Sequence, residues 1–299
     1  MKPSVIAAIG HVALGVRDLD VAVEQATTVM GLRVSRRADG QVDLTHGAQH
    51  HSLQFRAAAE DVLDHLGLEA EGPDGVAEIR RRLEAGDIPL VAEGPLDEGL
   101  EDGLAFELPG GALIEVYTGM PHDEPDYVAT GVRPTRFGHV NIYVEDPGPA
   151  LDVLVDVLDF RISDRVRGGA FTRCNADHHG IAVLPGDRKL HHHAWEVRDA
   201  GELVRLGDVL HARGEGLVEG PVRHGIGGNI AAYFRGPAGA AVEFYTDMEV
   251  ILDDAAFVPR DWDVQGTSWY SRWVPRMPPE EFRHLGAPFA PVSVGTAAG

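Results

Sequence analysis

Two histidines and one glutamate in the second half of the chain are residue types that bind divalent metal ions. His139 begins a stretch in which Val140 and Ile142 alternate with polar residues, and this pattern predicts a half-buried strand. His192 and Glu243 have the same polar parity in two later apolar stretches. All three side chains are therefore expected on one concave face. Two imidazoles and a carboxylate hold a first-row divalent ion on one side and leave coordination positions open, as a catalytic site requires, whereas four protein ligands would close a structural site.

Further polar residues are expected on the same face because of their distances from predicted turns. His179 and His192 lie almost equally far from the turn at residues 185–187, which predicts that they are cross-strand neighbours. Tyr233 and Glu243 are paired by the same reasoning about the next turn. The concave face is predicted to gather His139, Asn141, His179, His192, Tyr233 and Glu243, with His224 entering from the loop before Tyr233. The opposite parity belongs to His178, His191 and His193, which are expected to face away; a one-residue register error would exchange His178 with His179.

The elements that position these residues occur twice, because the sequence repeats itself at an offset of 128 residues. Residues 10–18 return as residues 138–146, and residues 112–120 return as residues 240–248. Two copies of one unit are therefore predicted, at about 4–120 and 133–248.

Each copy is expected to contain a strand, a helix and several strands, with a second helix before the last hairpin. In the second copy the predicted strands cover residues 140–144, 169–174, 180–184, 192–197, 231–235 and 241–245, and the helices cover residues 149–158 and 200–214. The predicted domains are an N-terminal domain at 1–120, a linker at 121–132, a C-terminal metal-binding domain at 133–248 and an aromatic, proline-rich arm at 249–299. We expect this arm to lie over a domain or a neighbouring subunit.

The first copy keeps part of the constellation. His11 and Glu115 match His139 and Glu243, and His65 matches His192 after a one-residue slip. His51 matches His179, but alanine stands at the position of Tyr233 and the loop at residues 94–98 has no histidine. The N-terminal domain is therefore predicted to be non-catalytic, and whether His11, His65 and Glu115 bind a second metal stays open.

Composition excludes several classes of partner. The 299 residues carry a net charge of −21, which would repel the phosphates of a nucleic acid or an anionic membrane surface. The single cysteine, Cys174, cannot form an internal disulfide, so a cytoplasmic protein is expected. The longest apolar run near the start is too short to span a bilayer, and no signal peptide or transmembrane helix is predicted.

Several motifs of the second half together resemble a known family. They are Gly-His139-Val-Asn, Asp-His-His179-Gly-Ile-Ala, Leu-His-His192-His-Ala-Trp-Glu-Val, Arg-His224, Tyr233-Phe and Gly-Ala-Ala-Val-Glu243-Phe-Tyr. The tandem units resemble the vicinal oxygen chelate superfamily, and the second half resembles the type I extradiol catechol dioxygenases. The resemblance covers about residues 4–248 and implies an α+β fold of paired βαβββ modules in two domains.

The resemblance also implies an activity. It assigns a mononuclear Fe(II), or alternatively Mn(II), to His139, His192 and Glu243 as metal ligands. A catechol-type substrate and O₂ would react there, and the ring would open beside its hydroxyls to give a semialdehyde-type product. His179 would act as acid–base, His224 and Tyr233 would hydrogen-bond the substrate oxygen, and Asn141 would line the oxygen side. A homo-oligomer is expected, because members of the superfamily associate.

Two other functions compete with ring cleavage. A glyoxalase-like metal-dependent isomerase or lyase would use the same scaffold without oxygen, but that chemistry leaves His179, His224 and Tyr233 unexplained. A metal-free small-molecule binding or resistance protein would not need the metal triad. The substrate itself is not determined by the sequence. Loops and the arm are expected to build the distal wall of the pocket, and Arg272 and Arg276 of the arm are interpreted as surface charges.

Overall fold

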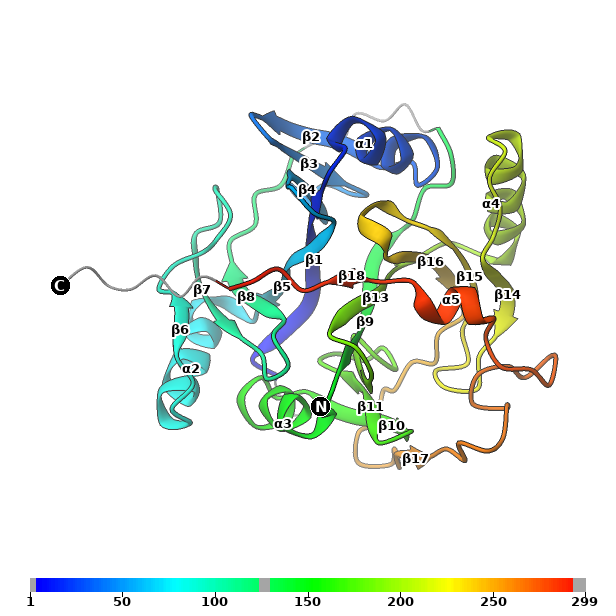
Figure 1. The fold of residues 1–299 in the computed structure, drawn as a ribbon. Coiled ribbons are helices and arrows are strands. Elements are labelled where there is room, and N and C mark those ends of the chain that lie inside the picture. Colours follow the sequence, from blue (N-terminus) through cyan, green and yellow to red (C-terminus); the bar gives the residue numbers. More distant parts are fainter. Residues whose placement is uncertain (1–3, 124–129, 293–299) are drawn as a thin grey trace.

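The computed structural model describes residues 4–123 and 130–292, which form one sheet in each half of the chain, as Figure 1 shows. The predicted α+β class with tandem βαβββ modules is confirmed. Residues 124–129 of the predicted linker and residues 293–299 of the predicted arm lie outside the described ranges. The division of the chain into the four predicted domains stays a prediction.

The N-terminal half contains two βαβββ modules. The first has β1 (Ile6–Val16), α1 (Leu19–Thr28), β2 (Arg33–Ala38), β3 (Gln41–Thr45) and β4 (Leu53–Ala57). The second has β5 (Val62–Ala70), α2 (Gly72–Ala85), β6 (Leu90–Ala92), β7 (Asp102–Glu107) and β8 (Leu113–Thr118). The strand order is β2-β3-β4-β1-β5-β8-β7-β6, so the first strands of the two modules pair at the centre of the sheet.

The C-terminal half repeats this plan. Its first module has β9 (Arg136–Val144), α3 (Pro147–Asp152), the π-helical turn η1 (Val153–Val157), β10 (Arg161–Val166), β11 (Gly169–Arg173) and β12 (Ile181–Pro185). Its second has β13 (Lys189–Glu196), α4 (Ala200–Ala212), β14 (Glu219–Arg223), β15 (Ile230–Arg235), the 3₁₀ turn η2 (Pro237–Gly239) and β16 (Ala241–Thr246). The order β14-β15-β16-β13-β9-β12-β11-β10 is the same arrangement, and the sequence reasoning had missed the short strands β10 and β14.

The alternating pattern of the sequence is what places the polar face. Val140, Ile142 and Val144 of β9 are fully buried in the core, so His139 and Asn141 point to the opposite face.

The aspartate that ends the repeated motif has a local role in both copies. Asp18 and Asp146 are helix N-caps whose carboxylates accept backbone hydrogen bonds at the starts of α1 and α3.

One predicted strand pairing is wrong. The strands on either side of the turn at residues 185–187 are not neighbours, because β9 lies between them. β12 pairs with β9 in parallel and β13 pairs with β9 in the antiparallel sense, so this connection passes over the end of β9. His179 and His192 are therefore not cross-strand neighbours. By contrast, the predicted pair Tyr233 and Glu243 is confirmed in the register of β15 and β16.

The C-terminal arm lies across both halves of the molecule (Figure 1). Its elements are β17 (Arg260–Asp261), α5 (Glu280–His284) and β18 (Ala287–Pro288). The strand β17 extends the second sheet beside β10, and β18 pairs with β13. Phe289 then forms a bridge to Leu63 in β5 of the first sheet. Among the described residues, no helix has both the length and the apolar character needed to cross a membrane.

Candidate metal centre

Three adjacent strands bring the predicted metal ligands together. His139 lies on β9, His192 on β13 and Glu243 on β16, and each of the three offers a ligand atom within 4.8 Å of the other two. Glu243 Oε2 is 3.2 Å from His139 Nε2 and 3.2 Å from His192 Nε2. All three residues are buried. Their role as metal ligands stays a prediction, but their convergence at one point has the geometry that such a role requires.

The hydrogen bonds of His191 fix the ring orientation of His192. His191 Nε2–H donates to the carbonyl oxygen of Phe282 at 3.0 Å, and burial lowers the pKa of His191 to about 4. The neutral His191 ring must then accept at Nδ1, where His192 Nδ1 lies 2.8 Å away. His192 consequently carries its proton on Nδ1 and turns the lone pair of Nε2 toward Glu243. Sequence parity had placed His191 away from the site, whereas it is a buried positioning residue.

His179 is oriented in the same manner by its own preceding histidine. His178 Nε2 lies 3.2 Å from the Asp164 carboxylate and donates to it, while His178 Nδ1 accepts from His179 Nδ1 at 3.2 Å. His179 Nε2 is therefore the nitrogen that carries the lone pair. Burial, together with the neighbouring histidines, lowers the pKa of His179 well below its ordinary value, so the ring is neutral at neutral pH. The ring lies 4.3 Å from that of His139, which places His179 rather than His178 at the centre.

Asn229 holds the carboxylate of Glu243. Its Nδ2 donates to Glu243 Oε1 at 3.0 Å, which leaves Oε2 to face the two imidazoles. Burial raises the pKa of Glu243. The electrostatic interaction and the hydrogen bond with His139 outweigh this effect and hold the pKa below its ordinary value. The sequence reasoning missed Asn229 because it lies in a loop where no periodic pattern predicts the direction of a side chain.

Tyr233 and His224 form a hydrogen-bonded pair above the triad. His224 Nδ1–H donates to the carbonyl oxygen of Tyr270 at 2.6 Å, so its Nε2 accepts from the Tyr233 hydroxyl at 2.8 Å. Burial raises the pKa of Tyr233 well above 10, which keeps the phenol protonated. Tyr270 belongs to the arm, so this segment takes part in the site through its backbone.

A cavity of about 310 Å³ opens on this group. Every predicted site residue lines it: His139, Asn141, His179, His192, His224, Tyr233 and Glu243. The arm contributes Trp269, Tyr270 and Phe282 to the wall, as expected. Arg272 and Arg276 are not among the described residues that line this cavity. They bind the Gly225 carbonyl and the Glu219 carboxylate instead.

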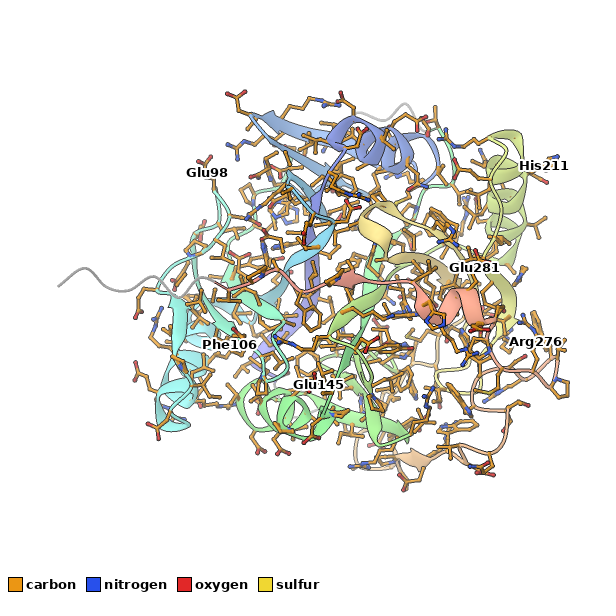
Figure 2. The ribbon with its side chains drawn as sticks, viewed as in Figure 1. Glu98, Phe106, Glu145, His211, Arg276 and Glu281 are labelled. Atoms are coloured by element: carbon orange, nitrogen blue, oxygen red, sulfur yellow. The ribbon has the colours of Figure 1, made fainter. Side chains whose placement is uncertain are left out.

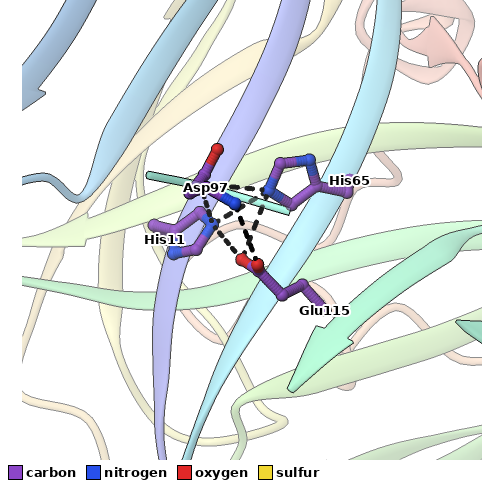
Figure 3. A group of neighbouring side chains, drawn as sticks. All are labelled: His11, His65, Asp97 and Glu115. Carbon is purple, nitrogen blue, oxygen red and sulfur yellow. Dashed lines mark hydrogen bonds and ion pairs between the residues drawn. The ribbon is translucent and has the colours of Figure 1, made fainter. Parts of the chain in front are cut away.

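The first half contains a second cluster, which Figure 3 shows. His11 on β1, His65 on β5 and Glu115 on β8 converge as their counterparts do, and Asp97 from the loop before β7 joins them. All four residues are buried. Burial lowers the pKa of His65, but hydrogen bonds to Asp64 and Asp97 outweigh it and raise that pKa to about 9.

The two clusters differ at two positions. Ala105 pairs with Glu115 in the register in which Tyr233 pairs with Glu243, so the phenol has no counterpart in the first half. Asp97 comes from the loop that corresponds to the one carrying His224. The sequence reasoning looked in this loop only for a histidine and therefore missed Asp97. A signal was available in the sequence. At the repeat offset of 128 residues, His224 corresponds to position 96, and the carboxylate of Asp97 is one residue further along.

Comparisons with known proteins agree with this architecture. The family model of the Glyoxalase/Bleomycin resistance protein/Dioxygenase superfamily matches residues 136–244, the segment that carries His139, His192 and Glu243. A solved structure, the Mn(II)-bound glyoxalase from Novosphingobium aromaticivorans, superposes with a TM-score of 0.86 at 26% identity and covers 98% of this chain and 99% of its own. The second half of the chain therefore matches this superfamily, also called the vicinal oxygen chelate superfamily, and the resemblance found in the sequence is confirmed.

Over most of its length the chain is also similar to a metapyrocatechase and to a dioxygenase. A metapyrocatechase from Geobacillus stearothermophilus is 25% identical over 295 residues, which cover 88% of this chain and 89% of the relative. A manganese-dependent 2,3-dihydroxybiphenyl 1,2-dioxygenase from Geobacillus genomosp. 3 is 25% identical over 308 residues, which cover 92% of this chain and 96% of the relative.

Proposed function

We propose that the protein is a metal-dependent extradiol dioxygenase that opens the ring of a catechol-type aromatic with O₂. One observation carries the proposal: His139, His192 and Glu243 converge on a cavity that also receives His179, His224 and Tyr233. An imidazole acid–base and a phenol paired with an imidazole are what proton transfer to and from a catechol requires. The names of the dioxygenase relatives support the same reaction.

The donor atoms of the triad fit a divalent cation. His192 Nε2 presents a lone pair, and Glu243 Oε2 is a carboxylate acceptor 3.2 Å away. Two acceptors that face each other in a buried site are stabilised when a cation lies between them. We propose that His139, His192 and Glu243 hold Fe(II), with Mn(II) as the alternative that the manganese-dependent relative supports. The ion would supply the Lewis acidity that lowers the pKa of a bound phenol, and the capacity to pass electrons from the substrate to O₂.

The residues around the triad handle protons. His179 is neutral and presents its Nε2 lone pair, so it accepts a proton at that atom and returns it later in the reaction. The Tyr233 hydroxyl donates to His224 Nε2, which leaves the phenol oxygen free to accept a hydrogen bond from a substrate hydroxyl. Asn141 Oδ1 is buried without a hydrogen-bond partner among the described residues, and Asn141 lines the cavity, where we propose that it faces O₂.

The wall of the cavity suits a planar aromatic substrate. Its apolar part is formed by Phe171, Leu184, Ile226, Trp269 and Phe282. The cationic side chains Arg167, Lys189 and Arg283 also line it, and away from the triad they outnumber the one carboxylate in the wall, Asp187. A catechol with a negatively charged substituent would therefore find complementary charge in this wall.

A glyoxalase-like isomerase or lyase is the second candidate, because the glyoxalase structure is as similar to the chain as the dioxygenase relatives are. That chemistry needs the metal but not O₂. It also leaves the His178–His179 and Tyr233–His224 pairs without a role. A metal-free binding protein would not need three buried ligand atoms at one point.

Anaerobic reconstitution tests the proposal. The apoprotein receives Fe(II) or Mn(II) without oxygen and is then mixed with ¹⁸O₂ and either a neutral or a carboxylate-bearing catechol. We expect one O₂ consumed per catechol, a yellow product that contains both labelled atoms, and no turnover of the His192→Ala variant. Loading that leaves O₂ untouched with every catechol would overturn the proposal, and turnover under strict anaerobiosis would establish the isomerase or lyase. We also propose that the protein is a homo-oligomer and that it is located in the cytoplasm. Size-exclusion chromatography is the first test of the oligomeric state.

A further inference from the structure

The first-half cluster has the shape of a closed coordination site (Figure 3). His11 Nε2 lies 3.0 Å from His65 Nε2, 3.2 Å from Asp97 Oδ2 and 3.3 Å from Glu115 Oε2. His65 Nε2 lies 3.4 Å from Asp97 Oδ2 and 3.6 Å from Glu115 Oε2. All four atoms lie within 4.8 Å of one another. A regular tetrahedron with edges of about 3.3 Å has its centre about 2.0 Å from each corner, which is the bond length of Zn²⁺ to imidazole nitrogen and carboxylate oxygen.

Protons alone do not satisfy these four atoms. His65 Nδ1 lies 2.7 Å from Asp64 Oδ1 and donates to it, so Nε2 is the ring nitrogen that faces the centre. Glu115 Oε2 is fully buried and has no hydrogen-bond partner among the described residues. A single proton between the rings would leave this oxygen with only the ion-pair contacts of 3.3 Å to His11 and 3.6 Å to His65, whereas a divalent cation at the centre contacts all four donors.

The surroundings hold each carboxylate with one oxygen toward the centre. Asp97 Oδ1 accepts from Arg56 at 2.6 Å and from Gln54 at 3.1 Å, while Oδ2 faces the imidazoles. Glu115 Oε1 accepts the backbone N–H groups of Leu96 and Asp97, at 2.5 and 3.3 Å. Such outer contacts are typical of metal ligands.

A glycine on the neighbouring strand, Gly67, leaves room for the imidazole of His11. A Cβ added at position 67 would lie 2.0 Å from the His11 ring, so only glycine fits opposite it.

We infer that the N-terminal half binds a second divalent cation, of the Zn²⁺ class, in a structural site closed by His11, His65, Asp97 and Glu115. The site is independent of the proposed ring cleavage. Because four protein ligands fill the tetrahedron and all are buried, no position remains for a substrate. The cation would join β1, β5 and β8 to the loop before β7. It would therefore stabilise the N-terminal half of the molecule.

The test uses the full chain with the other centre removed by His139→Ala/His192→Ala. After treatment with a chelator, this variant is titrated with Zn²⁺ alone, and bound metal and thermal midpoint are measured. We expect one Zn²⁺ per chain and a midpoint that rises by about 5 °C or more at a hundredfold excess over Kd. Co²⁺ in its place should give the intense visible absorption of a tetrahedral ion.

Substitutions within the loop provide the controls. Asp97→Asn in the same background should weaken Zn²⁺ binding by at least about 100-fold, because loss of even an outer partner of a ligand costs about 10- to 100-fold. Glu98→Gln is the matched control, because Glu98, labelled in Figure 2, is next in the loop. Its side chain is 81% exposed. It should bind Zn²⁺ as the parent does.

Several outcomes would overturn the inference. One is a parent that binds no Zn²⁺ and whose midpoint is unchanged by Zn²⁺ or chelator, since the cluster would then be held by protons. Equal losses in the Asp97 and Glu98 variants would be another. If the background variant does not fold, the metal content of the wild-type chain is compared with that of the Glu115→Gln variant. Two ions in the wild type and one in the variant support the second site. One ion in each contradicts it. None of these measurements uses O₂ or a catechol, so the result is separate from the fate of the proposed function.

Discussion

The two halves of the molecule use one strand plan to build two different centres. Each places a histidine on its first strand, a histidine on the first strand of its second module and a glutamate on its last strand. In the second half the loop before β15 supplies His224, which binds Tyr233 and leaves the cavity open. In the first half the corresponding loop supplies Asp97, which enters the group as a fourth donor. One loop side chain thus distinguishes a triad that lines a cavity from a group of four buried side chains.

Positions 179 and 51 give the largest expected difference between the two halves. His179→Gln should lower kcat by about 10²- to 10⁴-fold, because the general acid–base is lost while both triads remain. His51→Gln, its counterpart, should leave kcat unchanged, since the His51 ring contacts Asp97 and His11 of the first-half cluster. Oxygen uptake and metal analysis of both variants measure this. Equal losses in the two variants would mean that the halves are not functionally distinct.

The two glutamates are held differently, and this gives the second prediction. Asn229→Ala removes the side chain that holds Glu243, and it should weaken metal binding in the second half by about 10- to 100-fold. Leu96→Ala is the counterpart in the first half. It should have no such effect, because the bond to Glu115 comes from the backbone N–H. Metal titrations of both variants test this, and an unchanged affinity after Asn229→Ala would show that Glu243 needs no such support.

The smallest expected effect concerns the arm, which covers the cavity of the second half. Arg276, labelled in Figure 2, pairs with Glu219, whose side chain is 1% exposed. Arg276→Ala should lower the free energy of unfolding by about 1–3 kcal/mol, because it leaves a buried carboxylate unpaired. Arg235→Ala breaks the exposed pair with Glu281 and should cost no more than about 0.5 kcal/mol. Urea unfolding of the two variants decides, and equal costs would show that the arm is not anchored through Glu219.

Much of the candidate site follows from strand periodicity. The alternation in β9 predicts that His139 and Asn141 share a face, and the turn before β16 predicts the Tyr233–Glu243 pair. The pairing of His179 with His192 failed because symmetry about a turn assumes a hairpin, and β9 is inserted between the two strands. The roles of His178 and His191 were missed because parity tells which side a ring faces but not which atoms it bonds.

The sequence by itself determined the repeat, most of the strands and the polar face, because side chains alternate along a strand with a period of two residues whatever the rest of the chain does. Only the tertiary structure decided which loop residues complete each centre. Asp97, Asn229 and Tyr270 reach their partners through packing of segments that are distant along the chain, and no local pattern encodes such contacts. The difference between an open and a closed centre therefore lies in the loops, on a framework that both halves share.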